Sequence, residues 1–74
     1  MDKRVYLKEI DAELHQCDAL LYHAVARRYD LSNRVVSPDK EYLLGRFITR
    51  LDDEIRDYSR RAGLLIAERD GLSQ

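Results

Sequence analysis

The fold of this chain is decided by residues 7–35, which read LKEIDAELHQCDALLYHAVARRYDLSNRV. Spacings of three and four residues alternate through this stretch without a break. The positions on this spacing are Leu7, Ile10, Leu14, Cys17, Leu21, Ala24, Arg28, Leu31 and Val35. Such a repeat makes one stripe, here called the seam, along a helix that packs lengthwise against another helix. The seam is apolar or small except at Arg28, so it predicts a long helix with a helical neighbour.

A second seam of the same kind occupies the other half of the chain. Its positions are Leu44, Ile48, Leu51, Ile55, Tyr58, Ala62 and Leu65. Only a short segment separates the two stretches, and a short connection between two long helices makes them antiparallel neighbours. We therefore expect an all-α protein, an antiparallel two-helix hairpin that resembles a coiled coil.

The ends of the two helices are marked by capping signals. Ser37, Pro38 and Asp39 combine a capping residue, a proline that fits the first helical turn and an early acid. Asparagine and glycine tolerate the left-handed conformation that closes a helix. The expected elements are a helix over residues 4–33 with Asp2 as N-cap and Asn33 as its end, a turn over residues 34–37, and a helix from Pro38 to about Arg69 that ends at Gly71.

Length and charge limit the classes of function. A chain of 74 residues makes one domain, spanning residues 1–74, and its net charge of −1 does not favour nucleic acid or an acidic membrane as partner. Its apolar runs are too short to span a bilayer, and its start lacks a signal-peptide core. The single cysteine, Cys17, lies on the seam, where we expect a small buried hydrophobe and a reducing, cytoplasmic setting.

The apolar surface is wider than one seam near the turn. Tyr22, Val25 and Tyr29 flank the first seam, and Leu43 and Phe47 flank the second. One interpretation is a broad core that the turn of the chain itself covers. We favour the other, that these five residues bind another chain, because a two-helix hairpin buries little surface and is completed by a partner or a second copy.

Arg28 is the one candidate for anion binding. An arginine on a seam either extends its charged head to water along the edge of the helix or binds an anion or carboxylate. Asp30 and the neighbouring Arg27 and Arg34 offer a local explanation, and Asp30 and Arg34 stand at the spacing of a surface ion pair.

Other polar clusters have a simpler explanation than chemistry. His15 shares a helix face with Asp11 and Asp18, but no second histidine joins them, so we expect a solvated polar face and no metal or cofactor. The acids at 52–54 precede several arginines. Asp52 with Arg56, and Asp57 with Arg61, have the acid-first spacing of stabilising surface pairs.

Parts of the chain resemble known helical families. Residues 38–42 and the run Leu51-Asp52-Asp53-Glu54-Ile55 are similar to the second helix of the small co-chaperones that hold the needle subunit in type III secretion. That resemblance implies a hairpin of this length that is not an enzyme. It also implies that the protein pairs with a larger helical chaperone and keeps a secretion substrate soluble.

Two further resemblances are partial. The spacing of Asp18, Leu21, Arg28, Leu31 and Val35, and residues 41–47, are similar to the first two helices of the all-α chorismate mutases. That family implies a dimeric enzyme in which Arg28 binds substrate; position 11, where the family has a second arginine, is an aspartate here. The run Leu51-Asp52, Ile55, Tyr58 looks like part of a helix in the small aspartyl-phosphate phosphatases of sporulation control.

These observations favour a small binding module without catalytic residues, a co-chaperone or adaptor. The alternative is a chorismate-mutase-like helical enzyme that acts as a dimer.

Overall fold

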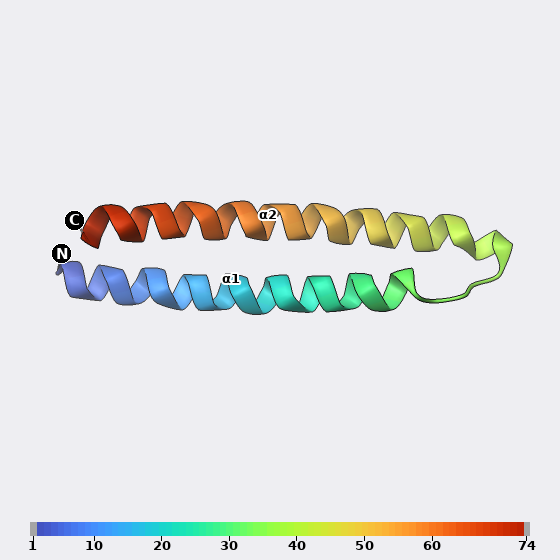
Figure 1. Cartoon of the computed structure of the whole chain (residues 1–74), viewed down its shortest axis with the longest axis horizontal. Coiled ribbons are helices and arrows are strands. Elements are labelled where there is room, and N and C mark those ends of the chain that lie inside the picture. The colour runs from blue at the N-terminus through green and yellow to red at the C-terminus, as the bar shows by residue number, and fades with distance from the viewer. Residues whose placement is uncertain (1, 74) are drawn as a thin grey trace.

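The computed structural model describes residues 2–73 and contains two long antiparallel helices (Figure 1). The elements are α1 (Lys3–Ser32), a short 3-10 helix η1 (Pro38–Lys40) and α2 (Glu41–Ser73). No strand occurs in residues 2–73. The chain leaves α1, crosses at one end of the molecule and returns along α2, so both chain ends lie together at the opposite end. The predicted all-α hairpin is confirmed.

The helix α1 begins and ends where its capping signals predict, but its end has a different backbone conformation. The side chain of Asp2 accepts a hydrogen bond from the Arg4 backbone N–H at 3.0 Å, and α1 starts at Lys3. Asn33 ends the helix as predicted, but its φ of −95° is not the left-handed conformation that the prediction assumed. The reason is that the amide side chain of Asn33 donates to the carbonyl of Tyr29 at 2.9 Å, and its backbone N–H donates to the same oxygen at 3.2 Å. The end of the helix is satisfied without a reversal of φ.

The connection between the helices is extended rather than helical. Because α1 stops at Ser32, its seam stops too, and Val35 is 98% exposed instead of continuing the seam as predicted. The neighbouring Val36 is half-buried, as expected where side chains alternate in extended backbone. Ser37 stands at the capping position but its side chain makes no capping hydrogen bond. Its carbonyl instead accepts from the Lys40 N–H at 2.9 Å and closes a 3-10 turn.

The helix α2 is shifted relative to its prediction at both ends. Its α-helical part starts at Glu41, after the 3-10 turn that begins at Pro38. At the other end it continues through Gly71 to Ser73, and no residue in 2–73 has a positive φ. Gly71 therefore does not end the helix. Leu72, the next seam position after Leu65 and Arg69, packs against the core and keeps the last turn helical.

Burial follows the predicted seams closely. The buried residues are Ile10, Leu14, Cys17, Ala24, Leu51, Ala62 and Leu65. Every one of them is a predicted seam residue, and Cys17 is a buried free thiol as expected. The core cluster joins the first half of α1 to the last half of α2, with Tyr6 and Leu72 packed against it. Toward the turn, Leu31, Leu44 and Ile48 stay only half-buried, so the core is concentrated at the end that holds the chain termini.

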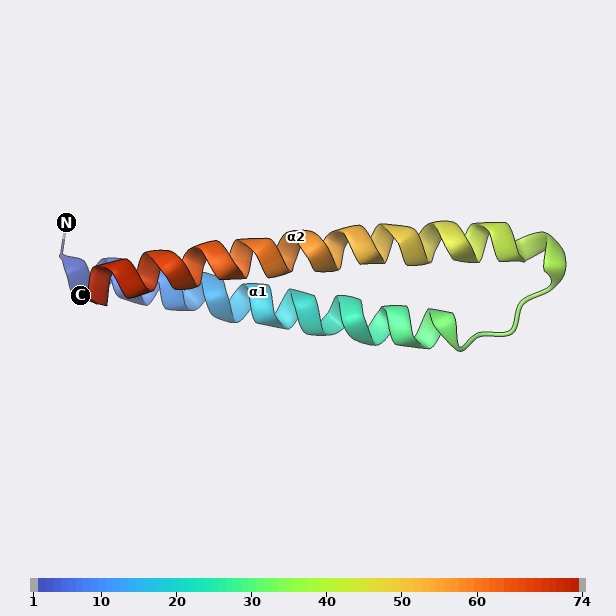
Figure 2. The same ribbon diagram turned by 45° about the horizontal axis from the view of Figure 1, so that its top comes forward.

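The two helices twist about each other. They lie side by side in Figure 1, whereas after a 45° turn they overlap near the chain ends and separate toward the connection (Figure 2). A strict seven-residue repeat produces this supercoil, because the seam would otherwise drift around a straight helix. The molecule is long and thin, and its radius of gyration of 17.0 Å exceeds the roughly 11 Å of a compact domain of this length.

The seam makes a direct prediction for stability. Leu14→Asp or Leu51→Asp each puts a carboxylate at a buried contact between the helices, and we expect a loss of roughly 3–5 kcal/mol in the free energy of unfolding. That loss is comparable to the whole stability of a small domain, so helical circular dichroism at 25 °C collapses. Val35→Asp is the matched control at a 98% exposed position and keeps its helicity. Native-like melting of Leu51→Asp would contradict the observed register.

Candidate functional site

The seam divides the surface of the hairpin into two broad faces. The seven positions of the repeat are lettered a to g. In α1 the a positions are Leu7, Leu14, Leu21 and Arg28, and the d positions are Ile10, Cys17, Ala24 and Leu31. Residues at e and b lie on one side of the seam, and residues at g and c lie on the other. In α2 the a positions are Ile48, Ile55, Ala62 and Arg69. Because the helices are antiparallel, e positions of both helices share one side, here the e face, and g positions share the other, the g face. The contact between Tyr6 and Glu68, both at g, agrees with this assignment.

The five predicted partner-binding residues are all exposed, but they do not form one surface. Tyr22, Val25 and Tyr29 occupy the e face of α1, with Tyr22 73% and Tyr29 69% exposed. Leu43 and Phe47, each half exposed, occupy the g face of α2. Both groups lie near the turn, as the sequence indicated. They are separated by the seam, so two different surfaces are present.

The e face near the turn is a stripe of tyrosines beside an open backbone. Tyr22, Val25 and Tyr29 follow a spacing of three and four residues and so line up along α1. Tyr22 contacts the ring of His23 edge-on, with 6.0 Å between ring centroids. On α2, Gly45 has no heavy atom within 4 Å of the place that a Cβ would take. The stripe therefore presents large aromatic side chains at the edge of a shallow surface.

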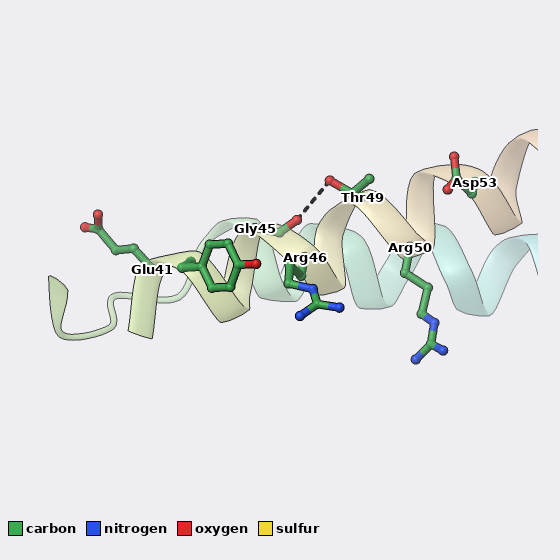
Figure 3. A pocket seen from close by; sticks show the side chains of 7 residues that line it. Glu41, Gly45, Arg46, Thr49, Arg50 and Asp53 are labelled. Carbon is green, nitrogen blue, oxygen red and sulfur yellow. Dashed lines mark hydrogen bonds between the residues drawn. The ribbon is translucent and has the colours of Figure 1, made fainter. Parts of the chain in front are cut away.

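The outer surface of α2 near the turn has a shallow hollow (Figure 3). It is lined by Glu41, Tyr42, Gly45, Arg46, Thr49, Arg50 and Asp53. The Arg46 guanidinium stacks over the Tyr42 ring at 5.8 Å from its centroid, and the Thr49 hydroxyl donates to the Gly45 carbonyl at 3.0 Å. Figure 3 shows Arg46 and Arg50 extending to the same side of the helix. The lining residues of this hollow all belong to α2.

The g face near the turn holds an apolar groove with a basic rim. The groove has a volume of about 310 Å³ and lies between the end of α1 and the start of α2. Its lining residues are Leu31, Val36, Leu43, Leu44 and Phe47, with Arg27, Arg34 and Lys40 at the rim. Arg50 lines the adjoining hollows beside Phe47. The half-buried seam residues reach this groove because the extended connection leaves them partly uncovered.

Arg28 is engaged with a partner that sequence spacing did not indicate. Its Nε donates a hydrogen bond to Oδ1 of Asp52 on the opposite helix, forming a salt bridge across the seam. The expected local partner was Asp30. The two side chains are 42% and 44% exposed, so the pair lies at the edge of the seam and in contact with water. An anionic substrate at Arg28 would have to compete with a carboxylate that is already bound.

The other charged groups also pair differently from the sequence expectation. Arg56 lies 3.9 Å from Asp53 instead of pairing with Asp52, which is held by Arg28. Asp11, one of the acids near His15, accepts from Arg69 on α2 at 3.3 Å. Within residues 2–73 no three His, Cys, Asp or Glu side chains are grouped so that they could hold a metal ion.

Tyr6 forms a polar clasp between the helix ends that sequence reasoning missed. Its hydroxyl donates to Oε1 of Glu68, 62 residues away. This hydrogen bond and the charge of Glu68 raise the pKa of Tyr6 above its ordinary value, and the charges of Glu13 and Glu9 add to the effect. Both residues occupy g positions. The sequence could have predicted their contact only if the repeats of the two antiparallel helices had been aligned with each other.

None of the helices in residues 2–73 is both long enough and apolar enough to cross a membrane. Comparisons with protein-family models, with curated proteins and with solved structures found no match for the chain.

The Arg28–Asp52 pair is expected to add little to stability. Exposed ion pairs contribute about 0.2–1 kcal/mol, and both members here are more than one-third exposed. A double-mutant cycle of Arg28→Ala, Asp52→Asn and the double variant, measured by urea unfolding, should give a coupling free energy below about 1 kcal/mol. A coupling of several kcal/mol would show that the pair is a buried, structure-determining interaction instead.

The raised pKa of Tyr6 predicts a loss of stability in base. The folded chain holds the hydroxyl proton more tightly than the unfolded chain, so the stabilisation is complete below pH 10, the ordinary pKa, and disappears as pH rises through the higher pKa of the folded state. Melting temperatures between pH 8 and pH 11 should therefore fall more steeply for the wild type than for Tyr6→Phe. Parallel pH profiles of the two proteins would contradict the clasp.

Proposed function

We propose that this protein is a non-enzymatic binding module that holds a helix of a partner protein on its e face, in the manner of a co-chaperone or adaptor. One observation carries the proposal. Tyr22, Val25 and Tyr29 form an exposed, aligned stripe at the end of the hairpin where the seam is least buried.

The chemistry of the stripe suits a protein partner. Tyrosine combines a large apolar ring with a hydroxyl that stays hydrated or finds a partner, and it is enriched among the residues that dominate interface energetics. A stripe with a spacing of three and four matches the ridge of another helix. The open surface at Gly45 gives that helix room to approach α2 as well.

A co-chaperone role agrees with the architecture. A short hairpin with an incomplete core is stabilised when a larger helical protein supplies further helices, and it shields the apolar surface of that protein in return. The proposal extends to a chaperone of a type III secretion system, the family that residues 38–42 and 51–55 resemble. We place this activity in the cytoplasm, because the buried Cys17 is a free thiol.

The engaged state of Arg28 favours binding over catalysis. A chorismate-mutase-like site needs cationic groups that converge on an anionic substrate, whereas Arg28 donates to Asp52 and position 11 is an acid that contacts Arg69. The guanidinium of Arg28 is therefore already paired with a carboxylate of the same hairpin.

The proposal is tested with the double variant Tyr22→Ser/Tyr29→Ser. A tagged wild-type chain is used to recover its partner from native lysate, and the affinity of the purified partner is then measured for both proteins. We expect the double variant to bind at least about 30-fold more weakly, because two tyrosine anchors contribute on the order of 1–2 kcal/mol each.

The matched control is Lys8→Ser/His15→Ser. These residues occupy the same position of the repeat on the same face of α1, about four turns (Lys8) and two turns (His15) of the helix away from Tyr22. This control should bind as the wild type does. Equal affinity of the tyrosine variant and the wild type would place the partner elsewhere on the molecule and refute the proposal.

A further inference from the structure

The g face consists of two halves of opposite charge. Near the turn, its g and c positions and the adjoining connection and η1 carry four cations and two acids, whereas its g and c positions from the middle of the hairpin to the chain ends carry four acids and one cation. The residues of the first half are Arg27, Arg34, Lys40 and Arg50 with Asp30 and Glu54; those of the second are Glu9, Glu13, Asp57 and Glu68 with Arg61. This separation of charge exists only on the folded face, because acids and bases are mixed along the sequence of both helices.

Independent contacts support both halves. In the basic half, Arg27, Arg34 and Lys40 share one groove, so they converge from α1, the connection and η1. In the acidic half, Tyr6 contacts Glu68, and the charges of Glu9 and Glu13 contribute to the raised pKa of Tyr6. Acids of both helices therefore lie around Tyr6.

Exposed apolar side chains occur in both halves of the same face. Leu43 and Phe47 lie in the basic half. Leu20 lies seven residues before Arg27, near the middle of the hairpin, and Leu64 lies fourteen after Arg50, toward the chain ends, so both keep the register of this face. Leu20 is 40% and Leu64 is 66% exposed. The face therefore offers apolar contact over most of its length.

The hairpin also has a larger accessible surface than the average monomeric protein of the same mass. Its accessible surface is 6151 Å², against the roughly 4700 Å² that monomeric proteins of 8.7 kDa have on average. The molecule measures 57 × 16 × 14 Å. The area of one of its long faces is therefore comparable to the ~800 Å² that each partner buries in a standard interface.

We propose that the g face binds the g face of a second copy, with the two hairpins antiparallel, to form a four-helix bundle. A two-fold axis that runs across the face exchanges the turn end with the end that holds the chain termini. It places the basic half of each copy on the acidic half of the other and sets α1 against α1. A parallel pair would place cations on cations and acids on acids, and like charges in contact oppose association. The interface is isologous, so both copies use the same surface and the assembly closes at two.

This dimer is independent of the partner proposed above. It covers Leu43 and Phe47 on the g face and leaves Tyr22, Val25 and Tyr29 exposed on the e face. The dimer presents two tyrosine stripes, one on each outer side.

Charge reversal on α1 and at Arg34 in the connection tests the interface without changing the seam. Arg27→Glu/Arg34→Glu gives both halves of the face a net negative charge, and Glu9→Lys/Glu13→Lys gives both halves a net positive charge. By sedimentation equilibrium at low ionic strength, the wild type should have twice its 8.7 kDa mass. Each double variant alone should dimerise at least 100-fold more weakly, and their equimolar mixture should recover the dimer. Added salt should weaken the wild-type dimer.

The fourfold variant separates the two orientations. With all four substitutions, the chain should pair with itself, because its halves are exchanged in charge, and should not pair with the wild type. Efficient pairing of the fourfold variant with the wild type would indicate a parallel arrangement and refute the proposal. A wild type that remains monomeric at millimolar concentration would refute it too, as would double variants that dimerise like the wild type.

Two controls complete the design. Helical circular dichroism of each double variant shows whether loss of the dimer reflects unfolding; recovery of both helicity and dimer on mixing the two would still identify the interface. Tyr22→Ser/Tyr29→Ser should remain dimeric, since these residues lie on the e face. Loss of the dimer in this variant would place self-association on the tyrosine stripe and refute the g-face interface.

Discussion

The whole molecule depends on one packing constraint: two helices can bury only a single stripe of each other. Seven-residue spacing keeps that stripe aligned over the length of α1 and α2, and the helices twist to follow it. Every buried residue is on the seam, and not one described side chain is less than 2% exposed. The hairpin thus has a seam and no deeper interior, so most of each helix remains surface.

The same constraint explains why polar contacts gather at the edges of the seam. Arg28 lies on the seam itself, and its Nε donates to Asp52 at an e position of the other helix. Arg69 does the same toward Asp11, again from an a position to an e position. Tyr6 and Glu68 close the opposite edge. These pairs lie in contact with water, so their contribution is to the alignment of the helices more than to the total free energy of folding.

Most of each helix is surface, so the two faces of the hairpin hold most of its side chains. Its two faces differ in chemistry. The e face carries aromatic side chains and an open backbone near the turn, whereas the g face carries an apolar groove and a division of charge along its length. We connect the first with a helical partner and the second with a copy of the chain itself. On this interpretation, the incomplete burial of Leu31, Leu44 and Ile48 near the turn is resolved by association.

The sequence alone determined the hairpin, its antiparallel direction and the seam residues within the two helices except Arg69 and Leu72, because a spacing of three and four residues permits one helical register and a short connection permits one direction; Val35, predicted on the seam, lies in the connection instead. It also indicated Asp2 as a cap and showed that the apolar surface widens near the turn. Only the tertiary structure decided which residues meet across the seam. Asp52 rather than Asp30 pairs with Arg28, Tyr6 meets Glu68, and Asp11 contacts Arg69. These outcomes depend on the longitudinal offset and relative rotation of two helices, which the extended connection at residues 34–37 sets and which neither helical repeat contains by itself.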